Sequence, residues 1–236
     1  MAFEKLWDLP WAEVLDSRLG AALRDGTVPT LAKRESAHAF SLPLFSAPFC
    51  AALGREVNAQ EGLPGLLLSR RIYLDDISPQ YADFAKRLLK DVLSPISAAL
   101  YGDDRPLVHP DVYGIAYSAS GSADSRLKLH QDDGDYTLNV CLEAEEMEGS
   151  ELVLCDGLHP RPGTPDWEEA EASYAHEVGR AILHPSDCWH GVKPIAKGRR
   201  TNLICLALRD DEEWKRSFYP ELREDLVRKR ASIAQQ

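Results

Sequence analysis

Two histidines in this chain of 236 residues each end a strand-like segment, and a second strand-like segment follows each of them. His130 ends an alternating stretch and precedes a turn and the apolar run 136–142. His190 comes after the apolar stretch 180–183 and a turn, and the apolar run 202–208 follows it. Short apolar runs bounded by turn residues are typical of β-strands. The pattern therefore predicts strand, turn and strand at both places, with each histidine at a strand end.

Asp132 stands two positions after His130, and this spacing suits a metal site. Side chains at i and i+2 of a strand point to the same side, so both can reach one ion. A His-x-Asp pair is common by chance, and its context has to give it weight. With His190 as a third ligand, two imidazoles and one carboxylate would hold a metal on one side and leave the opposite positions open. Non-haem Fe(II) oxygenases use this arrangement to bind a co-substrate and O₂.

Five phrases of the sequence resemble the 2-oxoglutarate and Fe(II)-dependent dioxygenases, in particular their prolyl and lysyl hydroxylase-like branch. They are residues 130–132 (HQD), 137–142 (TLNVCL), 148–152 (EGSEL), 179–185 (GRAILHP) and 190–200 (HGVKPIAKGRR). The resemblance implies a mainly β fold with flanking helices, in which a double-stranded β-helix of the jelly-roll or cupin type is backed by N-terminal helices. It covers roughly residues 40–210 and is most specific over 113–208.

The same resemblance implies roles for six residues. His130, Asp132 and His190 would bind Fe(II) and form the catalytic centre. Arg200 would bind the distal carboxylate of 2-oxoglutarate, for which a planar guanidinium is well suited. Strand alternation allows only one of Arg199 and Arg200 to point into the barrel, and the family spacing favours Arg200.

Two more positions complete the expected co-substrate pocket. Asn139 lies nine residues after the first ligand and would contact 2-oxoglutarate, which would give a polar residue in an apolar strand its hydrogen-bond partner. Tyr117, on the strand before His130, is the other candidate, although a buried tyrosine is often only part of the core. One departure from the family is Gly149-Ser150, where relatives usually carry two glycines.

Rival ligands are less suitable. Asp133 points to the wrong face of the strand, and Asp135 lies beyond the turn glycine. His184, before a proline, is interpreted as a turn residue. Lys128 shares the face of His130 and could meet a substrate acid group, or it could simply extend into solvent. The remaining histidines are interpreted as surface or capping residues: His38, His109, His159 and His176.

Length and composition indicate one dioxygenase domain spanning 1–236, since 44% apolar content is enough for a sizeable core. We expect helical support in 1–105, a β-helix core in 106–210 and a closing helix in 211–236. The helices are predicted from apolar stripes that begin at Trp11, Ser46 and Ser78 and, near the end, at Trp214. The first of these should stop before Gly26.

Charge and cysteine content indicate which partners and which cellular compartment to expect. The formal net charge of −11 would repel a phosphate backbone, so a nucleic-acid partner is not expected. No secretory signal or membrane span is recognisable, and five cysteines without paired spacing indicate reduced thiols in a cytoplasmic protein. The oligomeric state stays open.

The implied activity is hydroxylation of an unactivated C–H bond, coupled to conversion of 2-oxoglutarate and O₂ to succinate and CO₂; ascorbate is considered as an accessory reductant. The favoured substrate is a protein side chain of the prolyl or lysyl type. A free amino acid or small metabolite, a non-oxidative metal-dependent cupin and a non-catalytic sensor are the alternatives. The acidic segment 156–178 is either a substrate lid or a solvated face.

Overall fold

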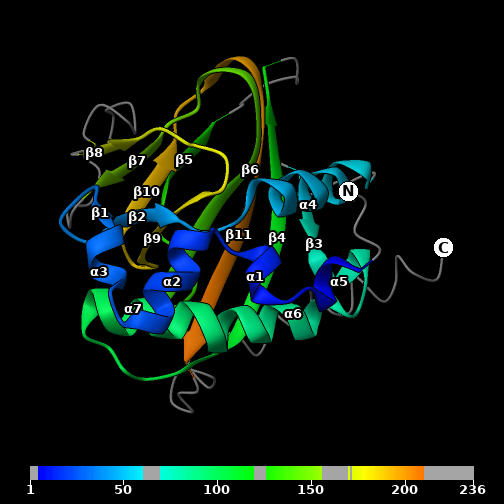
Figure 1. Cartoon of the computed structure of the whole chain (residues 1–236). Helices are drawn as coiled ribbons and strands as arrows, with labels where there is room; N and C mark the ends of the chain where they lie inside the picture. Colours follow the sequence, from blue (N-terminus) through cyan, green and yellow to red (C-terminus); the bar gives the residue numbers. More distant parts are fainter. Residues whose placement is uncertain (1–4, 61–69, 120–125, 156–169, 171, 210–236) are drawn as a thin grey trace, which may run out of the picture.

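A computed structural model describes residues 5–60, 70–119, 126–155, 170 and 172–209. Within them, two antiparallel β-sheets are stacked and helices cover the outer face of the larger one (Figure 1). The larger sheet has the order β1-β2-β9-β6-β11-β4-β3, and its strands are Lys33–Arg34 (β1), Phe40–Pro43 (β2), Arg70–Tyr73 (β3), Leu107–Ser118 (β4), Tyr136–Gly149 (β6), Arg180–Pro185 (β9) and Ile195–Arg209 (β11). The smaller sheet has the order β5-β10-β7-β8, with strands Leu127–His130 (β5), Trp189–Val192 (β10), Leu152–Cys155 (β7) and Ala172–Tyr174 (β8).

The helices of the described residues all lie between Leu6 and Tyr101. They are Leu6–Asp8 (η1), Trp11–Val14 (α1), Ser17–Asp25 (α2), Val28–Leu31 (α3), Ala47–Ala59 (α4), Leu74–Ile77 (α5), Tyr81–Leu88 (α6) and Ser94–Tyr101 (α7), with one π-helical turn at Leu89–Leu93 (η2). Helix α4 begins as predicted, because the Ser46 side chain accepts a hydrogen bond from the Phe49 amide. Helix α2 ends at Gly26, which adopts the left-handed conformation that glycine tolerates best.

The helix predicted from Trp11 to the glycine is two helices. Leu15 between them is extended and forms an isolated antiparallel bridge with Phe45. Asp16 then caps α2 by accepting from the Arg18 amide. Apolar residues of both helices, such as Val14 and Leu19, pack on the same core. The helical spacing of apolar residues therefore continues across the break. Tertiary contact with Phe45 therefore overrides the local helical pattern.

Alternation along the strands of the larger sheet separates two cores. The outer face packs on the helices through the largest apolar cluster, to which Leu138, Val140 and Leu203 contribute. The inner face meets the smaller sheet through a second cluster, which includes Ile115 and Ile204. A residue on any long strand therefore faces either the helices or the space between the sheets, and its neighbours face the opposite way.

Strand pairing puts the chemically interesting residues close together. His190 of β10 is directly opposite His130 of β5 in the smaller sheet. In the larger sheet Arg200 of β11 is opposite Tyr117 of β4. Both pairs come from strands that are far apart in the sequence, so the site depends on the completed fold.

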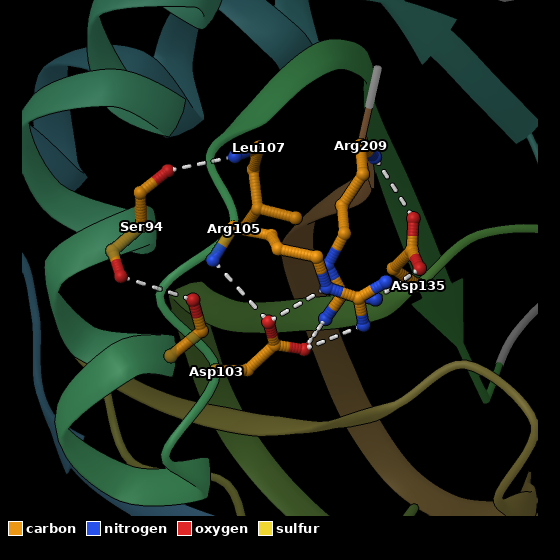
Figure 2. Close-up of polar contacts among 7 residues, drawn as sticks. Ser94, Asp103, Arg105, Leu107, Asp135 and Arg209 are labelled. Carbon is orange, nitrogen blue, oxygen red and sulfur yellow. Dashed lines mark hydrogen bonds and ion pairs between the residues drawn. The ribbon is translucent and has the colours of Figure 1, made fainter. Parts of the chain in front are cut away.

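A cluster of charges fastens the end of β11 to the start of β6 (Figure 2). Arg209 pairs with Asp135 at 2.6 Å and also contacts Asp103, which in turn pairs with Arg105 at 3.1 Å. The Arg209 amide donates to the Asp135 carboxylate at 2.8 Å, and the Arg209 guanidinium lies 5.3 Å from the centre of the Tyr136 ring. Asp135 lies three residues after Asp132, the predicted carboxylate ligand. The cluster therefore anchors the segment that carries this ligand.

The arrangement confirms the mainly β prediction with flanking helices. The segment 1–105 also supplies strands β1, β2 and β3, so its contribution is not purely helical. The predicted helix around Trp214 and most of the acidic segment 156–178 lie outside the described residues. All five cysteines are free and buried. Among the described helices, none combines the length and apolar character needed to cross a bilayer.

Candidate metal and co-substrate site

The imidazoles of His130 and His190 converge on the carboxylate of Asp132. Nε2 of His130 lies 3.3 Å from one carboxylate oxygen, and Nε2 of His190 lies 3.2 Å from the other. One donor atom from each residue falls within 4.8 Å of the others. Two donors bound at about 2.1 Å to one metal, at right angles, stand about 3 Å apart. The spacing of the three side chains therefore fits a single metal ion.

Backbone carbonyls set the orientation of both rings. Nδ1 of His130 lies 2.8 Å from the Lys128 carbonyl, and Nδ1 of His190 lies 3.0 Å from the Cys188 carbonyl. A carbonyl can only accept, so each Nδ1 carries a proton, and in the neutral form of the ring the lone pair of Nε2 points at the carboxylate. Lone pair and carboxylate repel unless a proton or a cation lies between them. This fits a metal-binding site.

Asp132 is held as an ionised carboxylate. Burial acts to raise the pKa of Asp132, but the interactions with His130 and His190 outweigh it and hold the pKa well below its usual range. Burial likewise acts to lower the pKa of His130, and its interaction with Asp132 raises the pKa overall. The Thr137 hydroxyl donates to Asp132 at 2.7 Å and lies 3.0 Å from the Ser186 hydroxyl. The carboxylate is thus oriented by a second layer of polar groups.

Arg200 lies inside the barrel and Arg199 lies outside it. Arg199 forms an exposed ion pair with Glu145. Arg200 is 1% exposed, and its guanidinium lies 4.7 Å from the centre of the Tyr117 ring. Within the described part of the chain, none of the three guanidinium nitrogens of Arg200 has a hydrogen-bond partner. A buried cation without an acceptor is costly, so this position fits an anionic ligand.

Asn139 is buried on the inner face, and its strongest contact is a neighbour that the sequence did not suggest. The Asn202 amide donates to the Asn139 carbonyl oxygen and also lies 3.2 Å from Nδ1 of His176. Asn202 follows Arg200 by two positions, so alternation alone could have placed it in the barrel. His176 was predicted to be a surface or capping residue and is instead buried. Only the completed fold brings it to this network.

The other histidines and the rival ligands considered in the sequence differ in their burial. His184 is a fully buried strand residue and not a turn residue, and its ring centre lies 4.5 Å from that of His190. Burial lowers the pKa of His184 to about 3, so it is neutral. Asp135 is engaged by Arg209, and Asp133 and Lys128 are exposed. His38 is exposed as predicted, and His159 lies outside the described residues.

Ser150, where the family resemblance leads one to expect glycine, has a left-handed backbone. Its φ is 64°, after Gly149 with a φ of 78°. The Ser150 side chain is fully buried, and its hydroxyl has no partner among the described residues. A serine in this conformation is strained where a glycine would not be. The departure from the family pattern thus has a structural consequence, a strained and buried serine.

No family model matches the chain. Residues of this chain are 31% identical over 190 positions to the 2-oxoglutarate and iron-dependent oxygenase domain-containing protein 2 of Mus musculus, covering 72% of this chain and 49% of that protein. They are 28% identical over 179 positions to the similarly named protein ICU11 of Arabidopsis thaliana, covering 70% of this chain and 44% of that protein. The chain thus spans about half the length of these curated relatives.

Solved structures agree on the fold. A 2OG-Fe(II) oxygenase family protein from Burkholderia pseudomallei superposes with a TM-score of 0.52 at 18% identity, covering 86% of this chain and 91% of that one. A prolyl-4-hydroxylase from Pseudomonas putida gives 0.52 at 16% identity, covering 82% of this chain and all of that one (100%). The chain is a homologue of the 2-oxoglutarate and iron-dependent oxygenase domain-containing proteins and has the double-stranded β-helix fold of the 2OG-Fe(II) oxygenases.

Proposed function

We propose that this chain is an Fe(II)- and 2-oxoglutarate-dependent dioxygenase that hydroxylates an unactivated C–H bond. The single observation that carries the proposal is the buried Arg200 guanidinium, which has no acceptor among the described residues although it shares a barrel with three converging metal donors. A non-oxidative metal-dependent cupin could use the same three donors. It would have no need of a cation buried at this cost.

In this proposal His130, Asp132 and His190 would bind Fe(II), and Arg200 would pair with the distal carboxylate of 2-oxoglutarate. The bound metal would supply the oxidising chemistry that couples succinate and CO₂ formation to hydroxylation. Tyr117 would hold the guanidinium in place through its ring. The two carbonyl-held imidazoles would keep their Nε2 atoms on the metal.

Asn139 would contact 2-oxoglutarate from β6, and its bond to Asn202 would fix its orientation. Burial of this pocket would exclude water from the reaction. The protein's own contribution is therefore positioning and electrostatics, which is what a co-substrate enzyme requires of its chain.

For the substrate we propose a protein side chain of the prolyl or lysyl type. The support is the exposure of the site on one side: the His130 side chain is 31% exposed, whereas that of His190 is 6% exposed. A side chain presented by another protein could approach from the His130 side. The Pseudomonas putida neighbour is a prolyl-4-hydroxylase, which is consistent with this class. Five free cysteines support a reducing compartment such as the cytoplasm.

The test is an anaerobic titration of the full chain with Fe(II) and 2-oxoglutarate, followed by the weak visible absorption of the chelate. The wild type should show the band. Arg200→Ala should weaken 2-oxoglutarate binding at least about tenfold, since a charge-assisted hydrogen bond contributes about 1.5–3 kcal/mol. Arg200→Lys should recover part of the affinity, because it restores the charge without the planar fork.

Arg199→Ala is the matched control, because it removes the neighbouring arginine from the exposed face of the same strand. It should bind 2-oxoglutarate like the wild type. Tight metal binding by the wild type without a chelate band would reject the oxygenase and favour a non-oxidative cupin. Normal circular dichroism of Arg200→Ala would show that its defect is in binding and not in folding.

A further inference from the structure

A second arginine, Arg71 on β3, lies on the inner face of the larger sheet. It pairs in register with Ile115, and Tyr73 pairs with Tyr113. Ile115 and Tyr113 belong to the cluster between the sheets, so Arg71 and Tyr73 project to the same side. Strand β3 is the edge of the larger sheet, and β5, which carries His130, is an edge of the smaller one.

On β4, Tyr117 lies two residues after Ile115, the partner of Arg71, so Arg71 is next along the inner face to the ring that stacks on the Arg200 guanidinium. Burial is the main influence on the pKa of His130 and on that of Tyr117, and the positive charge of Arg71 acts to lower both, which agrees with a position near these two residues. His130 is also the more exposed of the two imidazoles. Arg71 therefore stands beside the face from which a substrate could approach.

Aromatic groups and not carboxylates surround the guanidinium of Arg71. It lies 4.9 Å from the centre of the Tyr113 ring; burial acts to lower the pKa of Arg71, and the nearby Tyr113, Tyr73 and Tyr117 outweigh it, Tyr73 also through a hydrogen bond. Its Nε is buried and has no hydrogen-bond partner among the described residues. The guanidinium thus has one hydrogen bond to Tyr73 and an unpaired Nε, and its remaining N–H donors can bind an acceptor such as a carboxylate.

The positive charge of Arg71 contrasts with the negative net charge of the chain. With a formal net charge of −11, most of the surface repels anions. Lys128 adds a second positive charge on the opposite edge, since it shares the strand face of His130 and its side chain is exposed. Two cations flanking the metal donors of an acidic protein would select an anionic group and bring it to the site.

We propose that Arg71, supported by Tyr73 and Tyr113, binds a carboxylate of the substrate next to the position that is hydroxylated. The proposal rests on the proposed oxygenase function and specifies its substrate class as an acidic one, such as a peptide with a glutamate or aspartate close to the target residue. Arg200 would remain assigned to the co-substrate. The substrate carboxylate would bind Arg71 and the distal carboxylate of 2-oxoglutarate would bind Arg200, so the two would not compete for one arginine.

The test measures binding without turnover. Short amidated peptides labelled with fluorescein are prepared in a matched set containing glutamate, glutamine, phosphoserine or lysine. Their anisotropy is followed on the full chain under anaerobic conditions with Fe(II) and 2-oxoglutarate. Wild type should bind the glutamate peptides at least about tenfold more tightly than the glutamine peptides. Arg71→Met should abolish the difference, and Arg71→Lys should keep part of it.

Arg199→Met is the matched control, since it removes the same charge from an exposed position outside the barrel. It should keep the preference for glutamate. Absence of that preference in the wild type, or its persistence in Arg71→Met, would overturn the proposal. If the phosphoserine peptides bind more tightly than the glutamate peptides, the group that Arg71 recognises is a phosphate and not a carboxylate, which would also overturn the proposal.

The co-substrate is followed in parallel to separate the two assignments. The chelate band and the thermal midpoint of Arg71→Met should match those of the wild type. A weakened chelate in this variant would assign Arg71 to 2-oxoglutarate and reject substrate recognition. A wild type without any chelate band would reject the oxygenase function, whereas a preference for glutamate that depends on Arg71 would still be visible in the anisotropy.

Discussion

Replacement of Thr137 by valine should weaken metal binding without changing any proposed ligand. The hydroxyl of Thr137 donates to the Asp132 carboxylate at 2.7 Å and lies 3.0 Å from the Ser186 hydroxyl. Because Thr137 donates its only hydroxyl proton to the carboxylate, Ser186 is the donor in the second contact. Valine keeps the branched shape and removes only the hydroxyl, so packing is largely retained.

The expected size follows from the type of bond. A hydrogen bond to a charged group contributes about 1.5–3 kcal/mol, and each 1.4 kcal/mol is a factor of about ten in affinity. Thr137→Val should therefore bind Fe(II) roughly 10- to 100-fold more weakly, which agrees with the usual effect of removing a group that orients a metal ligand. The assay is an anaerobic titration of Fe(II) in competition with a chromogenic chelator.

Thr201→Val supplies the matched control. Thr201 is also buried, and its hydroxyl donates to Asn58 at 2.9 Å on the helix-facing side of the same sheet. This variant should lose about 1 kcal/mol of unfolding free energy and keep the wild-type metal affinity. Unchanged affinity in Thr137→Val, or an equal loss in Thr201→Val, would refute the argument that Thr137 acts through Asp132.

Three further substitutions test other parts of the structure. Ser150→Gly should raise the free energy of unfolding by about 1 kcal/mol, because it relieves a left-handed φ of 64° and removes a buried hydroxyl without a described partner; a lower urea midpoint would contradict this. Arg209→Met should lower it by about 1–3 kcal/mol, since Asp135 loses its ion pair and keeps only the backbone amide, while Asp103 keeps Arg105; differential scanning calorimetry measures the loss. Asn202→Leu should cost about 2–4 kcal/mol by leaving Asn139 and His176 without their donor, and a urea midpoint equal to that of the wild type would show that this network contributes little.

Local chemistry in the sequence was enough to predict several elements. The Ser46 cap and the Gly26 end of two helices depend on residues close together in the chain, and both are found in the structure. Alternation along β11 correctly separated Arg200 from Arg199. These predictions succeed because the period of two and the capping rules depend on the backbone alone.

Other features depend on contacts across the fold and could not be read locally. The break at Leu15 follows from its bridge to Phe45. His176 is buried because the chain leaving β8 passes Asn202 of β11, and no spacing in the sequence shows that meeting. The same holds for Arg71, whose short strand becomes relevant only once β3 pairs with β4, the strand that carries Tyr117. The roles of the six proposed site residues stay predictions that the experiments above test.

The two-sided character of the larger sheet has a consequence for how this chain can change over time. On β11, Leu203 and Cys205 face the helices, whereas Arg200, Asn202 and Ile204 face the smaller sheet. Mutations on the second set alter what the barrel holds and leave the helix contacts intact. A combinatorial library restricted to inward positions should therefore yield many folded variants with new ligand preferences, and the same number of changes placed on the outward positions should yield mainly insoluble protein.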